Sequence, residues 1–181
     1  MQPPNHYVTP PQANNITKVI TLIFELEKNS TGINNFWKKE FYPYENYNDE
    51  KVIIRINRDL GYYLNAAKWL KLIPIETKQS MNTYERVKFE ENGRALIFAN
   101  VDERFDVIRK IILQDPIYKK IEQFSNIYNE DESAFNKIII AEIQDERNPW
   151  RSFTGEILTE STAKRRLSCA ISWSKSLGIL I

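Results

Sequence analysis

Cysteine, histidine and glycine are scarce in this sequence of 181 residues, and each scarcity excludes a class of site. A single cysteine, Cys169, excludes a disulfide within the chain and a zinc site built on cysteines. A single histidine, His6, lies near the N-terminus and excludes metal sites and catalytic triads that depend on several placed histidines. Five glycines argue against glycine-rich phosphate loops and large all-β folds.

Long apolar runs and an excess of charge of one sign are also missing. No apolar run approaches the roughly 20 residues of a membrane-spanning helix, and the polar, proline-rich N-terminus does not resemble a secretory signal. We therefore expect a soluble, cytoplasmic protein. The net charge is only +1, from 25 basic and 24 acidic residues, so a nucleic-acid surface would require local segregation of charge. Hydrophobic residues make up 42% of the chain, which is enough for a packed core.

Apolar residues recur at three- and four-residue steps along much of the chain, which predicts a mainly α-helical fold. In the first half we expect helices over residues 15–28, 35–41, 49–70 and 94–100, with Asn15 as an N-cap and a turn at Asn92-Gly93. In the second half we expect helices from Phe105, from Asp115-Pro116, and over residues 133–144 and 159–177, with loops at 129–131 and 147–159. Residues 1–14 hold four prolines and are expected to form a flexible arm or an ordered clamp.

Two segments after the helix at 49–70 have the composition of strands. Residues 72–75 and 84–89 flank a polar tip at 77–83, and this order is typical of a recognition helix followed by a wing. We therefore expect a mainly α fold with a small β-wing, arranged as an arm (1–14), a first winged-helix unit (15–100) and a second helix-turn-helix unit (101–181). A shift of 107 residues aligns Arg58 with Arg165 and Leu70 with Leu177, although two amphipathic helices also match in this way by chance.

The predicted helix at 159–177 carries the clearest functional signal. At about 100° per residue, one side of it is apolar or small, with Ala163, Leu167, Ala170, Ile171, Ser174 and Leu177. The opposite side has cations and hydroxyls and no acid: Ser161, Lys164, Arg165, Ser168, Ser172 and Lys175. Because cations contact phosphates and guanine edges while short side chains let a helix enter the major groove, this side predicts binding to double-stranded DNA. Residues 147–178 hold six cations and two acids, which segregates charge to this end. An ordinary solvated basic face is the alternative.

A second set of candidate DNA contacts lies in the first unit. The outer face of the helix at 49–70 is expected to present Arg55, Arg58, Tyr62, Asn65 and Trp69, and the wing to carry Lys78, Arg86 and Lys88. Arginine and asparagine recognise guanine and adenine, and tyrosine hydrogen-bonds phosphate. Packing of Tyr62 and Trp69 against the arm or the second unit is an equal alternative, and an ordinary exposed hairpin would also carry such cations.

Two strings resemble winged-helix modules attached to bacterial type II restriction proteins. Residues 61–73, GYYLNAAKWLKLI, resemble the YY-x-x-A-x-x-L-G-L-I core, and residues 160–167, ESTAKRRL, with Ser172-Trp173 and Leu177-Gly178-Ile179, resemble its STAxRR…SW…LG end. The resemblance covers the chain from about residue 14 onward and implies DNA binding in a bacterial restriction–modification system, with a nuclease or methyltransferase subunit as a partner. Lys71 stands where the modules have glycine, and residues 41–50 are an insert. Since little chain follows Ile179, we expect a wingless second unit or one module of a longer protein.

No catalytic residue, metal or cofactor is expected. A nuclease needs carboxylates that hold Mg²⁺, and the nearest arrangement is Asp131 with Glu142-Ile143-Gln144, where residues 135–143 fit a helix better than a buried strand. Asp102, Glu103 and Asp106 are interpreted as acids at a helix start. Two further functions stay open. A protein–protein adaptor is favoured by the 12% aromatic content, and plasmid or phage replication initiators also use paired winged helices.

Overall fold

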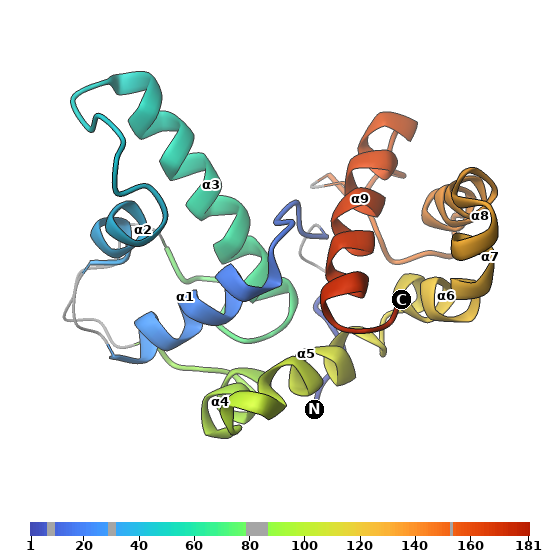
Figure 1. Cartoon of the computed structure of the whole chain (residues 1–181), viewed down its shortest axis with the longest axis horizontal. Helices are drawn as coiled ribbons and strands as arrows, with labels where there is room; N and C mark the ends of the chain where they lie inside the picture. The colour runs from blue at the N-terminus through green and yellow to red at the C-terminus, as the bar shows by residue number, and fades with distance from the viewer. Residues whose placement is uncertain (7–9, 29–31, 79–86, 153) are drawn as a thin grey trace.

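The structure is a computed structural model that describes residues 1–6, 10–28, 32–78, 87–152 and 154–181 (Figure 1). Within these ranges the chain is helical, which confirms the expected fold class in its main part. None of the helices in these ranges has the length and apolar character needed to cross a membrane. The elements are α1 (Ile16–Lys28), α2 (Ile33–Phe41), α3 (Glu50–Trp69), α4 (Glu91–Phe98), the short 3-10 helix η1 (Val101–Glu103), α5 (Arg104–Ile112), α6 (Pro116–Gln123), α7 (Ser125–Glu130), α8 (Glu132–Gln144) and α9 (Glu160–Ser176).

Side-chain caps fix the starts of the main helices where the sequence predicted them. Asn15 accepts a hydrogen bond from the Thr17 amide at 2.9 Å, and the Asp49 carboxylate accepts one from the Lys51 amide at 2.9 Å. Thr159 caps α9 in the same way. Each cap satisfies an amide that has no partner within the first helical turn, so the chain enters the helix at that residue.

The expected β-wing is not found in the described residues. Residues 72–75 form no strand, because the Leu72 amide donates to the Ala67 carbonyl (2.9 Å) and so closes the end of α3. The Leu72 carbonyl accepts from the Glu90 amide at 3.2 Å. Both backbone polar groups of Leu72 are therefore used, and neither is left to pair with another strand. Residues 79–86, which include the wing tip and Arg86, lie outside the described residues. In the described part of the chain, β pairing is limited to one isolated antiparallel bridge between Arg151 and Ile157.

Two expected irregular segments are helical instead. Asn92-Gly93 is not a turn but lies in the first part of α4, where both residues are buried. The Asn92 amide group donates to the Leu70 carbonyl at 2.8 Å, and a Cβ atom on Gly93 would lie 2.1 Å from the Leu72 carbonyl oxygen. The Asn-Gly pair therefore serves close packing against the end of α3 rather than chain reversal. Residues 129–130, expected in a loop, form the end of α7.

The helices form two groups that share one core. α1 and α2 pack against α3 in the first half, while α6 and α8 pack against α9 in the second, and α4 contacts both α1 and α5 (Figure 1). Trp69 at the end of α3 is fully buried, with its ring 6.3 Å from Trp150 and from Trp173 and 6.0 Å from Tyr118. The expectation that Trp69 lies on an outer face is therefore wrong, and its alternative, packing against the second half, is confirmed.

The described part of the N-terminal arm is an ordered clamp between the two halves. Its Gln2 amide donates to Asn92 at 2.8 Å, and its Asn5 amide donates to the Trp69 carbonyl at 2.6 Å. Further along, the Asn14 carbonyl accepts a hydrogen bond from the Ser172 hydroxyl of α9 at 2.6 Å. Figure 1 shows this segment, in dark blue, running between α3 and α9.

α3 and α9 end in the same backbone conformation, 107 residues apart. Lys71 (φ 52°) follows α3 and Gly178 (φ 64°) follows α9, and both lie in the left-handed region. The amide of the next residue then donates to the carbonyl five positions before it in both helices. Leu72 donates to Ala67 at 2.9 Å, and Ile179 donates to Ser174 at 2.8 Å. This is the Schellman arrangement, and it places the sequence repeat on equivalent structural positions at the two helix ends.

Candidate functional site

A cleft of about 500 Å³ lies between α3 and α9. One wall comes from the middle of α3 and the other from the start of α9, while the arm and the segment before α9 complete it. Its size is that of a small-molecule pocket rather than of a surface dimple. The lining residues are Gln12, Gly61, Tyr62, Asn65, Ser152, Glu156, Ile157, Leu158, Thr159, Thr162 and Arg166.

The wall before α9 is held by a tight chain reversal. The Ser152 amide donates to the Glu156 carbonyl at 2.8 Å, and the Gly155 amide donates to the Ser152 carbonyl at 3.0 Å. Gly155 has φ 83°, a conformation that side-chain-bearing residues seldom adopt. Gln144 of α8 then donates to the Leu158 carbonyl at 3.2 Å, so this wall is fixed to the second half of the fold.

Arg166 is the charged group deepest in the cleft wall. Its side chain is 8% exposed, and its Nε atom is buried without a hydrogen-bond partner. Burial lowers its pKa to about 10, although the nearby Cys169 thiol acts in the opposite direction. Within the described residues, no carboxylate forms an ion pair with this guanidinium. A desolvated cation without a counter-ion is costly, and an anionic ligand would offset that cost.

Polar groups from three parts of the chain line the cleft. Tyr62 and Asn65 of α3 are among them, and Tyr62 is 37% exposed. At the start of α9 the hydroxyl of the capping residue Thr159 donates to the Thr162 hydroxyl oxygen at 3.0 Å. Glu156 is the acid among the lining residues, and its carboxylate accepts a hydrogen bond from Thr154 at 3.1 Å.

The predicted polar stripe of α9 is largely on the surface. Ser161, Lys164, Arg165, Ser168 and Lys175 are exposed on a regular helix. The Arg165 guanidinium lies 3.5 Å from the Thr162 hydroxyl oxygen, to which it donates. Five of the six predicted stripe residues are therefore exposed, as the sequence predicted.

Three details of that stripe differ from the expectation. It was expected to lack an acid partner, but Glu160 pairs with Lys164 one turn later, and this contact lowers the pKa of the Glu160 carboxyl. Ser172 is half-buried because its hydroxyl is bonded to the arm. Lys175 lies 5.0 Å from the Tyr128 ring centre, and a hydrogen bond to Tyr128 raises the pKa of the lysine. Arg165 is thus the stripe's cation with neither an acid nor an aromatic partner within the described residues.

The candidate residues of the first half separate into three environments. Arg55 is exposed and forms an ion pair with Glu45, and Arg58 is exposed without an ion pair in the described structure. Tyr62 and Asn65 line the cleft. Lys78 and Lys88, expected on the wing, are exposed, while Arg86 lies outside the described residues.

Arg166 and Thr162 were not predicted as site residues from the sequence. Both belong to a third face of α9, between the apolar side and the stripe, on which Cys169 and Trp173 also lie. The signal was the spacing of these four residues by four, three and four positions, which is itself a helical repeat. Only the position of α3 shows that this face borders a cleft.

The carboxylates considered for a nuclease do not come together. Asp131 caps α8 by accepting from the Ala134 amide at 3.0 Å, and Glu142 lies near the other end of that helix, where it pairs with Lys120 at 3.3 Å. In the described part of the chain, no group of three or more His, Cys, Asp or Glu side chains is arranged to hold a metal ion. Asp102 and Glu103 lie in η1, at the helix start where they were expected.

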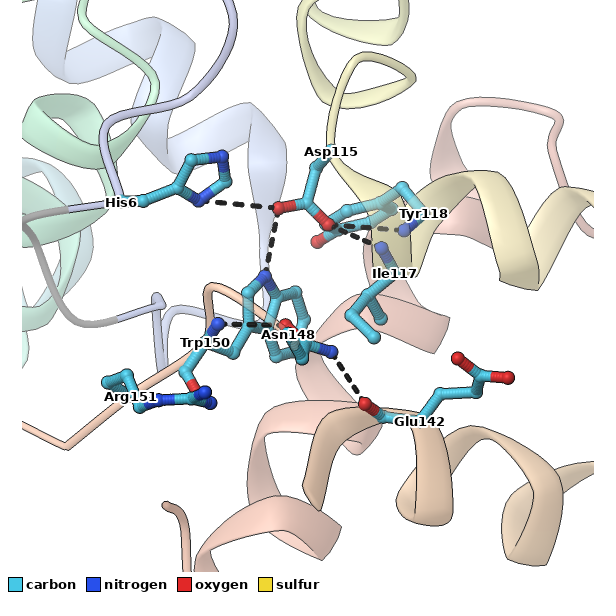
Figure 2. A network of polar contacts seen from close by, with 8 residues as sticks. All are labelled: His6, Asp115, Ile117, Tyr118, Glu142, Asn148, Trp150 and Arg151. Atoms are coloured by element: carbon cyan, nitrogen blue, oxygen red, sulfur yellow. Dashed lines mark hydrogen bonds and ion pairs between the residues drawn. The ribbon is translucent and has the colours of Figure 1, made fainter. Parts of the chain in front are cut away.

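A buried polar network around Asp115 links the arm to the second half (Figure 2). Asp115 is fully buried and accepts hydrogen bonds from the Ile117 amide at 2.8 Å and from the Trp150 ring nitrogen at 2.9 Å. His6 of the arm approaches the same carboxylate, with Nδ1 at 3.8 Å. Burial raises the pKa of Asp115 to about 6 and lowers the pKa of His6. The network therefore joins the arm to the start of α6 and to the segment that follows α8.

One family model matches the chain, and its description is "Domain of unknown function (DUF7226)". The match covers residues 50–177 and therefore includes both helices that border the cleft. Neither the curated proteins nor the solved structures give a significant match to the chain.

Proposed function

The chain belongs to the family described as a domain of unknown function, DUF7226, and we propose that it binds double-stranded DNA through the exposed stripe of α9. The observation that carries the proposal is the exposure of Arg165, flanked by the exposed hydroxyls of Ser161 and Ser168. Such a helix offers a long cation for phosphates or guanine edges and short side chains where it must approach the groove closely.

The ion pair between Lys164 and Glu160 is compatible with this function. Both side chains are largely exposed, and an exposed pair of this kind contributes little to stability. Lys164 can therefore exchange its carboxylate partner for a DNA phosphate at little cost. Release of counterions from the phosphates would favour that exchange at low salt.

α3 provides a second DNA-binding helix in this proposal. Arg58 on α3 aligns with Arg165 on α9 under the same 107-residue shift that superimposes the two helix ends, and both arginines are exposed. We propose that the two three-helix groups are tandem helix-turn-helix units of winged-helix type. Each would then place one equivalent arginine on DNA.

The test is duplex affinity measured by fluorescence anisotropy at two salt concentrations. Changing Lys164→Ala with Arg165→Ala should lower the affinity at least tenfold and flatten its dependence on salt, because two phosphate contacts are lost. The matched control removes two exposed lysines from other helices, Lys110→Ala with Lys137→Ala, and should leave the affinity within about threefold. Equal losses of duplex affinity in both variants would show that the effect comes from net charge alone. Unchanged affinity in the first variant would refute the proposal.

A protein–protein adaptor is the second candidate, favoured by one specific surface feature. Phe98 at the end of α4 is 84% exposed, and Val101 of η1 is 68% exposed close behind it in the chain. Exposed apolar residues that cluster are typical of partner contacts. An adaptor would bind a labelled duplex weakly or without the salt dependence expected of phosphate contacts.

The biological setting is a further part of the proposal. A restriction–modification system predicts a nuclease or methyltransferase gene beside this one, whereas a replication initiator predicts repeated sites at an origin. Sequencing the neighbouring reading frames separates these two settings. DNA selected by the protein from a random pool would show whether it binds one site or repeated sites.

A further inference from the structure

We propose that the cleft between α3 and α9 binds a phosphate ester of a nucleoside, with Arg166 as its principal anion contact. This inference does not depend on the DNA-binding stripe, because the cleft is lined by a different face of α9. The phosphate could be carried by a free nucleotide, as a monoester, or by a DNA strand, as a diester, and the experiments below separate these two sources.

The main argument is an unsatisfied buried cation. Arg166 is more than nine-tenths buried, its Nε atom has no partner, and the residue lines the cleft. Nearly every other buried polar group of this kind in proteins has a hydrogen-bond partner. The titratable and charged groups that act on Arg166 are Cys169, Arg165 and Tyr62, and none of them is a carboxylate.

The surrounding donors favour phosphate over a simple halide or an apolar ligand. Besides Arg166, the cleft is lined by Tyr62 and Thr162, whose side chains carry hydroxyls. Arginine forks match the oxygens of phosphate, and hydroxyls can donate to those oxygens. The Thr162 hydroxyl oxygen accepts from Thr159, which leaves its own hydrogen available for a ligand oxygen.

The rest of the cleft fits an organic group attached to the phosphate. A volume of about 500 Å³ exceeds what inorganic phosphate fills, and Tyr62, Ile157 and Leu158 supply apolar surface. The side-chain amide of Gln12 lies on the same lining and suits the polar edge of a base. Glu156 also lines the cleft, so a second negative charge at that side of the ligand would be disfavoured.

Calorimetry on the full chain tests the proposal with three probes: inorganic phosphate, adenosine monophosphate and unphosphorylated adenosine. If the source is a free nucleotide, the monophosphate binds more tightly than inorganic phosphate, and adenosine binds at least tenfold more weakly. Arg166→Gln should reduce monophosphate affinity at least tenfold. Because Arg166→Gln changes a buried residue of α9, Thr162→Val provides a near-isosteric second test, with a reduction of about threefold or more expected from the loss of one donor.

Binding to DNA is the second part of the test. If the source is a DNA strand, the monophosphate fails to bind, but Thr162→Val and Arg166→Gln lower the affinity for DNA while thermal unfolding shows a folded chain. Arg165→Ala separates this inference from the proposed function, since it should weaken duplex binding and leave monophosphate binding unchanged. The inference is overturned if no phosphate probe binds and neither cleft variant changes DNA affinity.

Discussion

Lys71 and Gly178 occupy the same position after the two longest helices, and both have a left-handed backbone, with φ of 52° and 64°. Glycine adopts this conformation without a steric penalty, whereas lysine does not. Lys71 stands where the restriction-associated modules resembled by the sequence have glycine, and the backbone there still has the geometry that glycine favours. Lys71 therefore adopts the same left-handed backbone as Gly178, at a steric cost that glycine does not carry.

Replacing Lys71 with glycine should therefore stabilise the protein. We expect Lys71→Gly to raise the free energy of unfolding by about 0.5–1 kcal/mol, because the left-handed conformation no longer carries a Cβ penalty. Urea denaturation measures the change. Gly178→Ala is the matched control at the equivalent position and should destabilise by about 1 kcal/mol. A loss of stability in Lys71→Gly would show that lysine's side-chain contacts outweigh the strain.

Gly93 is required by close packing rather than by its backbone angle. A Cβ atom there would lie 2.1 Å from the Leu72 carbonyl oxygen, which is backbone and has no side-chain freedom to move away. We expect Gly93→Ala to destabilise by about 2–3 kcal/mol through displacement of α4 from the end of α3. Gly32→Ala, where an added Cβ meets no atom within 4 Å, should cost under about 1 kcal/mol. Equal effects at the two glycines would contradict this account.

Asp115 should make stability depend on pH between about 4 and 6. Its pKa is about 6 in the folded protein and about 3.9 in an unfolded chain, so over this range the folded state binds more protons. The contribution of Asp115 to stability is therefore fully present below pH 4 and falls by about 2–3 kcal/mol as the pH rises to 6. Asp115→Asn removes this titration, so the stability of the wild type relative to the variant should fall across that range.

His6 acts on the same network with the opposite sign. Its pKa is lowered in the folded state, first by burial and then by Lys71, so its contribution to stability increases as the pH rises toward 6.5. The comparison with Asp115→Asn should therefore be repeated in a His6→Asn background. If the slope between pH 4 and 6 survives in the double variant, groups other than these two produce it.

Arg58 and Arg165 should contribute similarly to duplex binding if the two helix groups are equivalent. Each single change to alanine should weaken binding by about three- to tenfold and reduce the salt slope by about one, because each removes one phosphate contact. Anisotropy titrations over a range of salt provide both quantities. A large effect of Arg165→Ala with none for Arg58→Ala would assign DNA binding to α9 alone.

Arg166 should make the protein less stable when no ligand is bound. Replacing a buried, unpaired cation with an apolar residue of similar volume is often neutral or stabilising, so Arg166→Met is expected to raise the free energy of unfolding by about 1 kcal/mol or leave it unchanged. Thermal unfolding without added ligand measures it. Strong destabilisation would instead identify Arg166 as a packing residue whose aliphatic stem and head hold α9 in place.

The local features of this fold were predictable from the sequence. Asn15, Asp49 and Thr159 cap their helices where the apolar repeats begin, and the exposed stripe around Arg165 follows from helical periodicity alone. These properties depend on residues within a few positions of each other, so the local sequence determines them. The apolar repeats and the capping residues therefore predicted most of the helices.

Contacts between distant segments were decided only by the tertiary structure. The sequence determined that α3 and α9 are amphipathic helices with polar faces, but not that Trp69 turns inward to meet Trp150 and Trp173. Nor did it show that Gly93 packs on the Leu72 carbonyl, or that Arg166 faces Tyr62 across a cleft. Each of these depends on which helices pack together. Burial of the whole core decides that packing, and the apolar pattern of a single segment does not predict it.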